Sequence, residues 1–404
     1  MLAARPDLQG IFRPVASLGH VVLAVSGGSD SMALLRLAAQ WGRQFGDDCA
    51  LSVLTVDHRL REGSAAEAEK VAGWAKGLGL NHAILPWMAS RGGSGLQARA
   101  RKARYDLMAA WCREQGAEAL LTAHKLDDQA ETVLMRLSRT ASIDSLAAIR
   151  GDGHWDGVRL VRPLLGERRE ALRAYLLSIG QDWIEDPSNT DKRFERVRLR
   201  QSLSGLGLSA QALADLGRAA AEVSAGLWKS AESFIDVYVK GSPFGFGVTP
   251  SGPLLALPSA VRDRVIGCLI GRYGGGGRAE PGEIARLAAS LAAGTCRRTL
   301  AGAMILRRKD TVLVGREAGR IARVPMTIPA AGRFLWDRRF AIAGEPGAEI
   351  VAAGTLPDVP RNATIPAFVQ AGLPAILAAG RLRAIPHLGI GFGASAAFRP
   401  PPFR

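Results

Sequence analysis

The sequence predicts an α/β fold: a doubly wound parallel sheet, Rossmann-like, in the first half, followed by smaller, mainly helical and α+β domains. Two observations predict the sheet. Short apolar runs alternate with segments of helical length, and each polar cluster of interest follows such a run or lies in the helix after it. In folds of this kind, ligands bind beyond the carboxyl ends of the strands. Functional residues are therefore expected where strands end.

The elements of the first half follow in a regular order. Four apolar runs predict strands at residues 21–25, 51–56, 83–85 and 119–122. The segments after them have helical spacing and predict helices at 31–45, 65–78, 96–114 and 127–138. Right-handed crossovers should join the strands, and a further helix is expected to end at Ser178.

The chain of 404 residues is too long for one ordinary domain. Three domains are predicted, at 1–205, 206–320 and 321–404. In the second half, helices are expected at 209–233, 259–273 and 281–291, and strands at 299–307 and 311–315. Residues 241–258 are rich in Gly and Pro and are interpreted as a linker.

One aromatic cluster stands out in the last 84 or so residues, where the role of the domain is left open. It comprises Phe334, Trp336 and Phe340. A strand with core aromatics is favoured over a base-stacking platform, because stacking needs exposed aromatic rings and charged residues break the alternation here.

The charge balance points to a polyanionic partner. The sequence has 52 Lys and Arg against 37 Asp and Glu, a net charge of +15, and a pI near 10.5. Such an excess favours nucleic acid, although generally high arginine usage would produce the same excess.

The cysteines and the apolar segments predict a cytoplasmic protein with no membrane partner. The four cysteines form no C-x-x-C pair, which disfavours zinc ribbons, iron–sulfur clusters and a disulfide framework. The first residues lack the apolar stretch of a signal peptide, and no run of some 18 uncharged apolar residues occurs.

A phosphate-binding turn is predicted directly after the first strand. Its residues are Ser26, Gly27, Gly28, Ser29, Asp30 and Ser31. Two glycines let backbone N–H groups approach an anion, and the following helix N-terminus adds positive charge. Asp30 would repel phosphate unless it holds Mg²⁺ or meets a cationic substrate. An ordinary capped turn is the alternative, but the succession of strand, loop and helix disfavours it. The turn resembles the PP-loop of the ATP pyrophosphatase superfamily, which cleaves ATP between the α and β phosphates.

Paired carboxylates are predicted after the fourth strand. Asp127 or Asp128 should cap the helix that begins there, and Asp128 and Glu131 lie three residues apart on one helical face. The two acids could hold an ammonium ion and later take its proton, or bind a metal together with Asp30. A capping box with solvated acids explains Asp127, but leaves His124 beside the same crevice unexplained.

Basic residues should face the same crevice. Arg101 and Arg104 lie three apart on a predicted helix and could clasp phosphate, the alternative being an exposed basic face. His58 follows the second strand, where a nucleotide-facing loop and a solvated polar loop are about equally expected.

Residues 121–137 closely resemble the corresponding segment of the tRNA(Ile)-lysidine synthetases, and the likeness extends over about 15–205. The resemblance places the segment of His58 at the ATP and substrate crevice, and His124 belongs to the closely matching segment itself. The family also has an Arg-Tyr pair at the end of the helix that contains Arg104. The resemblance also implies an Arg-rich helix over the crevice, in which Arg198 is the candidate electrophilic or substrate-ordering cation. Val197 stands where the family usually carries Asn.

The resemblance implies an ATP- and Mg²⁺-dependent ligase. In that family, ATP adenylates the C2 oxygen of the wobble cytidine, position 34, of the isoleucine tRNA with a CAU anticodon. L-lysine then attacks C2 and expels AMP, leaving lysidine. The expected catalytic residues are Asp30, Asp128, Glu131 and Arg198. A homodimer stays an open alternative. The rival function is a PP-loop tRNA thiolation enzyme, which would normally need cysteines as sulfur carriers or cluster ligands.

Overall fold

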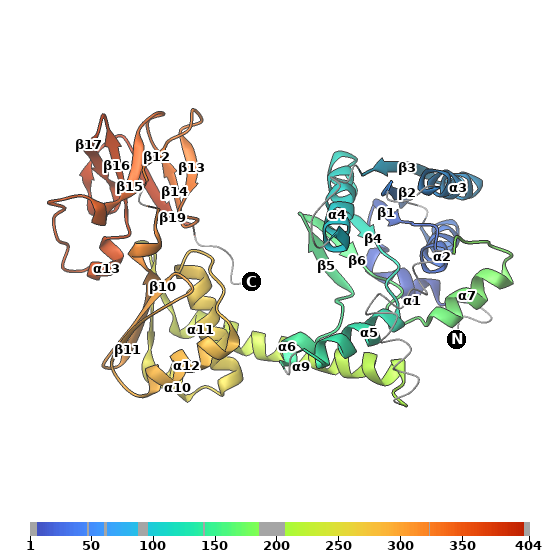
Figure 1. Ribbon diagram of the computed structural model, residues 1–404, viewed down its shortest axis with the longest axis horizontal. Helices are drawn as coiled ribbons and strands as arrows, with labels where there is room; N and C mark the ends of the chain where they lie inside the picture. Colours follow the sequence, from blue (N-terminus) through green and yellow to red (C-terminus); the bar gives the residue numbers. More distant parts are fainter. Residues whose placement is uncertain are drawn as a thin grey trace. The chain divides into compact units, whose positions relative to one another are not determined.

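The computed structural model describes residues 6–46, 48–59, 63–87, 96–139, 142–185, 207–322 and 324–399. Contacts divide the chain into two compact units, Met1–Ser224 and Ala225–Arg404. Figure 1 labels the elements of both units. The three-domain division expected from the sequence stays a prediction.

A six-stranded sheet forms the centre of the first unit, in the order β3-β2-β1-β4-β6-β5. Every neighbouring pair is parallel except β5 and β6. The strands are β1 (His20–Ala24), β2 (Ala50–Asp57), β3 (Asn81–Pro86), β4 (Ala119–Leu121), β5 (Asp152–Trp155) and β6 (Val158–Val161). The predicted doubly wound parallel sheet is confirmed, with an antiparallel edge added by β5.

Helices cover both faces of this sheet (Figure 1). They are α1 (Leu8–Phe12), α2 (Ser29–Phe45), α3 (Ser64–Gly77), α4 (Leu96–Glu114) and α7 (Arg169–Ser178). Alternate residues of β1 explain the two layers: Val21 and Leu23 pack in a core with α1, α2, α3 and α7, whereas Val22 packs in a second core with α4. Because both faces of the strand are buried, successive residues are all apolar, which explains the near-continuous apolar runs in the sequence.

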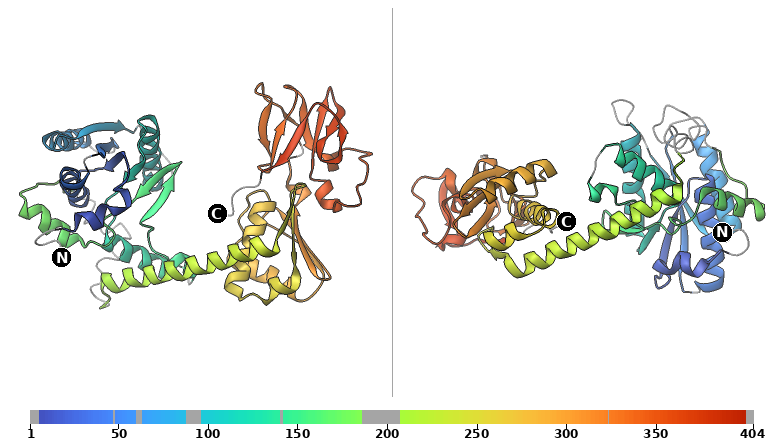
Figure 2. Two further views of the ribbon diagram at one scale, coloured as in Figure 1. Left: turned by 180° about the vertical axis from the view of Figure 1, so that it is seen from behind. Right: turned by 90° about the horizontal axis from the view of Figure 1, so that it is seen from below.

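A third helical group of the first unit has a small core of its own. It contains α5 (Leu126–Leu137), α6 (Ile143–Leu146) and the first half of α9 (Ala210–Tyr238), which Figure 2 shows as one unbroken helix. Val133 and Leu213 belong to its small core. At Gly217 a Cβ would come within 2.6 Å of Ala148 Cβ and 2.7 Å of Val133 Cγ2, so only glycine allows this close approach.

The second unit begins with a five-stranded sheet in the order β7-β8-β11-β10-β9. Its strands and helices are β7 (Lys240–Ser242), β8 (Phe246–Pro250), α10 (Ser251–Ala256), α11 (Ser259–Tyr273), α12 (Pro281–Ala292), β9 (Cys296–Leu300), β10 (Ala303–Arg308) and β11 (Thr311–Arg316). The interpretation of residues 241–258 as a linker is therefore wrong. A glycine in this segment allows a side chain to pack directly on the strand backbone: a Cβ at Gly247 would come within 2.4 Å of the Tyr273 ring.

Residues 299–307, predicted as one strand, lie instead in a hairpin of β9 and β10. The turn residues Ala301 and Gly302 have φ of +47° and +83°, the left-handed values of a tight two-residue hairpin turn. Apolar residues on both sides of this turn concealed it in the sequence.

Two further sheets complete the second unit, in the orders β12-β15-β16-β17-β18 and β13-β14-β19. Their elements are β12 (Met326–Thr327), β13 (Arg333–Trp336), β14 (Phe340–Ala343), β15 (Glu349–Ala352), α13 (Ala367–Gln370), β16 (Pro374–Ala378), β17 (Arg381–Ile385), β18 (Ile390–Gly391) and β19 (Ser395–Phe398). Trp336 and Phe340 are 2% and 0% exposed, which confirms their prediction as core aromatics.

Candidate active site

The phosphate loop lies at the point where the strand order reverses, between β1 and β4. It leaves β1 and enters α2, whose N-cap residue, Gly28, has no side chain to occupy the free N–H groups of the first turn. Ser31 Oγ donates to the Gly28 carbonyl at 2.9 Å and accepts from Ser26 N at 3.2 Å. Ser31 therefore ties the loop backbone to the first turn of α2, whose N-terminus favours an anion.

The loop requires glycine at position 27 for its backbone conformation and for close packing. The φ of Gly27 is +87°, and a Cβ there would lie 2.5 Å from Ile184 Cδ1. The Gly27 carbonyl also accepts a hydrogen bond of 2.8 Å from Ile184 N. The loop is thus backed by the segment that follows α7.

A buried lysine joins the phosphate loop to the acids after β4. Lys125 is 2% exposed, and its Nζ lies 2.8 Å from Asp30 Oδ2 and 3.2 Å from each oxygen of Asp128. Burial alone would raise the pKa of Asp128, but the Lys125 charge and hydrogen bonds hold that pKa below its usual range. The structure therefore brings Asp30 and Asp128 together, as the sequence predicted, around a cation that the sequence analysis missed.

The three acids of this segment, Asp127, Asp128 and Glu131, have different surroundings. Asp128 accepts from Lys125 N at 3.0 Å and so caps α5. Asp127 instead accepts from Arg169 N at 2.8 Å, at the first turn of α7. Glu131 lies one turn further along α5 and is 2% exposed.

One oxygen of the site is available to a metal. Asp30 Oδ1 is buried and has no hydrogen-bond partner among the described residues. No cluster of three or more His, Cys, Asp or Glu side chains suited to a metal occurs in the described part of the chain. A Mg²⁺ ion held by one or two carboxylates and completed by substrate phosphates fits this arrangement.

Two arginines of α4 each meet a histidine from a different strand end. Arg104 donates to His58 Nε2 from its Nε at 3.2 Å and from its Nη2 at 2.8 Å, and His58 follows β2. Arg101 Nη2 lies 3.5 Å from His124 Nε2, and His124 follows β4. Since β1 lies between β2 and β4, both pairs border the strand that leads into the phosphate loop. Burial, and then the Arg104 cation, lower the pKa of His58 to about 4.

His58→Lys is expected to weaken ATP binding by at least about tenfold, because a cation would replace the neutral acceptor of Arg104 and repel it from the crevice. His58→Gln keeps an acceptor and should retain most of the affinity. Calorimetric titration with ATP checks both variants, with His154→Lys on the edge strand β5 as the matched control. Equal losses in His58→Lys and His154→Lys would contradict the role given to His58.

The same histidine gives a pH dependence. Its pKa in the fold, about 4, is below the ordinary 6.5, so the unfolded chain binds the proton more tightly. The contribution of His58 to the free energy of unfolding is therefore complete above pH 6.5 and is lost as the pH falls toward 4. Denaturant titrations should show a shallower acid decline in His58→Gln.

Two cations on α7 were missed by the sequence analysis. Arg169 Nη2 lies 3.6 Å from Asp30 Oδ2, and Arg173 Nε lies 3.5 Å from Ser29 Oγ. Arg173 also pairs with Glu185 at 2.7 Å. Their signal in the sequence is weak, because Arg168 and Arg169 lie between Glu167 and Glu170. Arg198, the predicted catalytic cation, lies outside the described residues.

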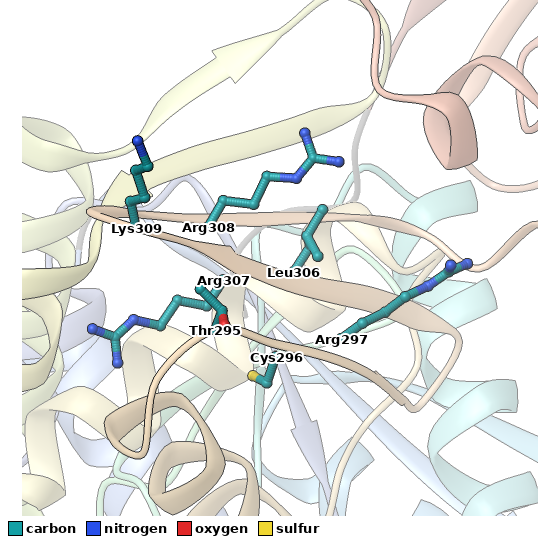
Figure 3. Close-up of a pocket in the computed structure, with 7 residues that line it drawn as sticks. All are labelled: Thr295, Cys296, Arg297, Leu306, Arg307, Arg308 and Lys309. Atoms are coloured by element: carbon teal, nitrogen blue, oxygen red, sulfur yellow. The ribbon is translucent and has the colours of Figure 1, made fainter.

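A basic surface lies on the β9–β10 hairpin of the second unit. An open hollow of about 590 Å³ is lined there by Thr295, Cys296, Arg297, Leu306, Arg307, Arg308 and Lys309. Figure 3 shows Arg297 and Arg308 extending from the hairpin, and Lys309 from the turn that follows β10. Arg307 differs, because it donates to the Leu291 carbonyl at the end of α12.

Within the described ranges, none of the helices has both the length and the apolar character needed to cross a membrane.

Comparisons with known proteins agree with this geometry. A family model of the PP-loop domain matches residues 4–206. The tRNA(Ile)-lysidine synthase of Ruegeria pomeroyi is 39% identical over 334 residues, covering 80% of this chain and 76% of the relative. That of Rhodopseudomonas palustris is 40% identical over 322 residues, covering 78% of this chain and 92% of the relative.

Among solved structures, a U34-tRNA thiolase from Methanococcus maripaludis is 14% identical with a TM-score of 0.45, covering 54% of this chain and 76% of that chain. A likeness at that score carries no argument about function. The matched PP-loop domain and the extent of the sequence identity do: the chain belongs to the tRNA(Ile)-lysidine synthase family.

Proposed function

We propose that this protein ligates L-lysine to C2 of the wobble cytidine of the isoleucine tRNA with a CAU anticodon. The observation that carries the proposal is the convergence of the phosphate loop, Asp30 and Asp128 at the sheet's switch point in a chain of this family. The cytoplasm, where tRNA and ATP meet, is the expected compartment.

Two displacements make up the reaction. The C2 oxygen of cytidine attacks the α phosphorus of ATP, and pyrophosphate leaves. The side-chain amine of lysine then attacks C2, the C–N bond forms, and the C–O bond to AMP breaks. The amine must lose protons, and the crevice must keep water from the activated base.

The chain's own residues have distinct tasks in this scheme. Ser26, Ser29 and the backbone N–H groups at Gly27 and Gly28 would hold the polyphosphate. Arg101 and Arg104 would bind phosphate from the α4 side, with His124 and His58 orienting them. Asp30 would hold Mg²⁺ through its unpartnered Oδ1, and the metal would neutralise phosphate charge.

Asp128 and Glu131 are proposed to orient the lysine amine, and Glu131 to accept its proton, because Lys125 holds the pKa of Asp128 below its usual range. Asp128 is 18% exposed and pairs with the Lys125 ammonium. This pairing supports the proposal that the Asp128 carboxylate can bind an ammonium group. Arg198 stays the proposed cation that orders the substrate.

Nucleoside analysis tests the function directly. A CAU-anticodon isoleucine tRNA transcript is incubated with the protein, ATP, Mg²⁺ and labelled lysine, and lysidine is expected at position 34. The methionine tRNA, which shares the anticodon, is the matched control and should stay unmodified. A parallel reaction with a sulfur donor addresses thiolation. A thiolated cytidine in that arm, without lysidine in the first, would overturn the proposal.

The cysteines argue against thiolation. Cys49 precedes β2 and lies at the amino end of the sheet, whereas Cys112 is buried in α4. Cys268 and Cys296 belong to the second unit. None of the four stands in the phosphate loop or in the turn after β4.

The β9–β10 hairpin is proposed to contact tRNA phosphates. Arg297→Glu or Arg308→Glu should weaken tRNA binding for all sequences and lower the slope of log affinity against log salt by about 1 each. Filter binding at several salt concentrations checks this, with Lys76→Glu at the end of α3 as the control. An unchanged slope in both hairpin variants would rule the contact out.

A further inference from the structure

The ammonium group of Lys125 is held by two carboxylates of the site. Its Nζ lies 2.8 Å from Asp30 Oδ2 and 3.2 Å from both oxygens of Asp128, which share one N–H donor. The two carboxylates come from different elements, α2 and α5. At 2% exposure, the side chain has no room to turn toward solvent. A lysine is rarely buried this deeply unless its charge is paired.

This geometry differs from that of a lysine that binds phosphate. A phosphate-binding lysine directs its charge at the nucleotide, whereas the buried Lys125 directs its charge at two carboxylates. Its charge instead offsets those of Asp30 and Asp128. Without Lys125, Arg169, whose Nη2 lies 3.6 Å from Asp30 Oδ2, would offset one of the two negative charges, and the other would stand beside an anion-binding helix N-terminus and would repel polyphosphate.

We propose that Lys125 is an internal counter-ion: it occupies the Asp30–Asp128 pair in the nucleotide-free site, keeps that site receptive to polyphosphate, and prevents the pair from binding a divalent cation on its own. Lys125 is thus a positioning residue that acts through the two acids. The inference rests on ATP binding at the phosphate loop, and is independent of the base that is adenylated.

Lys125→Met tests this, because methionine keeps the length of the side chain and removes the charge. Mn²⁺ binding without nucleotide, followed by electron paramagnetic resonance, should become at least about tenfold tighter as the carboxylates are released to the metal. ATP binding in excess EDTA should weaken by a similar factor. Lys102→Met is the matched control, since Lys102 pairs with Asp106 on the exposed face of α4. It should change neither measurement.

A double variant identifies the source of the new metal affinity. Lys125→Met with Asp128→Asn leaves one carboxylate, so Mn²⁺ affinity should return toward that of the unsubstituted protein. Unchanged Mn²⁺ and metal-free ATP binding in folded Lys125→Met would overturn the proposal.

The unsubstituted protein supplies a test that does not depend on the folding of any variant. Its nucleotide-free Mn²⁺ binding should be weak, roughly millimolar, because Lys125 fills the pair. Stoichiometric micromolar binding that Asp30→Asn removes would also overturn the proposal. Neither measurement contains tRNA or lysine, so a failure to form lysidine would count against the proposed function and leave this inference standing.

Discussion

Asp30→Asn is expected to lower lysidine formation by roughly 100-fold or more, the scale on which loss of one preorganised electrostatic group slows an enzyme. Asn keeps the size of the side chain and removes the charge that is proposed to hold Mg²⁺. The fold should survive, because Lys125 keeps its contacts to Asp128 at 3.2 Å. Lysidine yield, pyrophosphate release and thermal unfolding together separate the loss of activity from a loss of structure.

Asp156→Asn is the matched control for this change. Asp156 also forms an ion pair, with Arg113 at 2.7 Å, but it lies in the turn between β5 and β6 and is 62% exposed. Its replacement should leave lysidine formation near normal. Near-normal activity in Asp30→Asn would show that the acid in the phosphate loop has no role in the reaction.

Two truncations are expected to behave very differently although they differ by only a few helical turns. A chain ending at Ser224 should fold and bind ATP, because Leu213 and Ser224 pack against the first unit. A chain ending at Lys240 adds Phe234 and Ile235, which are 6% and 4% exposed in the core of the second unit. Removing that core would expose both side chains, at about 1.5–3 kcal/mol each, and should cause aggregation.

Both truncated chains should have lost the modification of tRNA, because the basic hairpin is absent. Light scattering and calorimetric titration with ATP distinguish the two chains, and filter binding measures tRNA affinity, which should fall at least about tenfold. If the chain ending at Lys240 were as soluble as the one ending at Ser224, the second half of α9 would not depend on the second unit. Normal modification by the shorter chain would remove the second unit from substrate binding.

Much of the first unit follows from its sequence. Strands buried on both faces require apolar runs, so β1 to β4 were predicted to within a few residues. The edge strand β5 was missed, because its residues Asp152–Trp155 are largely polar and alternate in exposure. In the last two sheets of the second unit, the strands β12 to β19 are only two to five residues long, which is too short to show a period.

Part of the site could also be predicted from the positions of the strands. Loops after strands predicted the meeting of Asp30 with Asp128, since the carboxyl ends of parallel strands share one edge. Lys125 could not be predicted, because lysine is ordinarily exposed and its partner Asp30 is distant in the sequence. Asp127 accepts a hydrogen bond from the first residue of α7 and does not cap its own helix. This contact depends on packing between helices, which no local sequence pattern encodes.

The hydrogen bond between Ile184 N and the Gly27 carbonyl has a thermodynamic consequence. It ties the backbone of the phosphate loop to the residues that follow α7, where Glu185 in turn holds Arg173. A ligand that displaces Gly27 must do work on Ile184. By reciprocity, anything that fixes Ile184 in place alters the affinity of the loop for that ligand by the same factor. A change in the position of this flanking segment would therefore be expected to change nucleotide affinity.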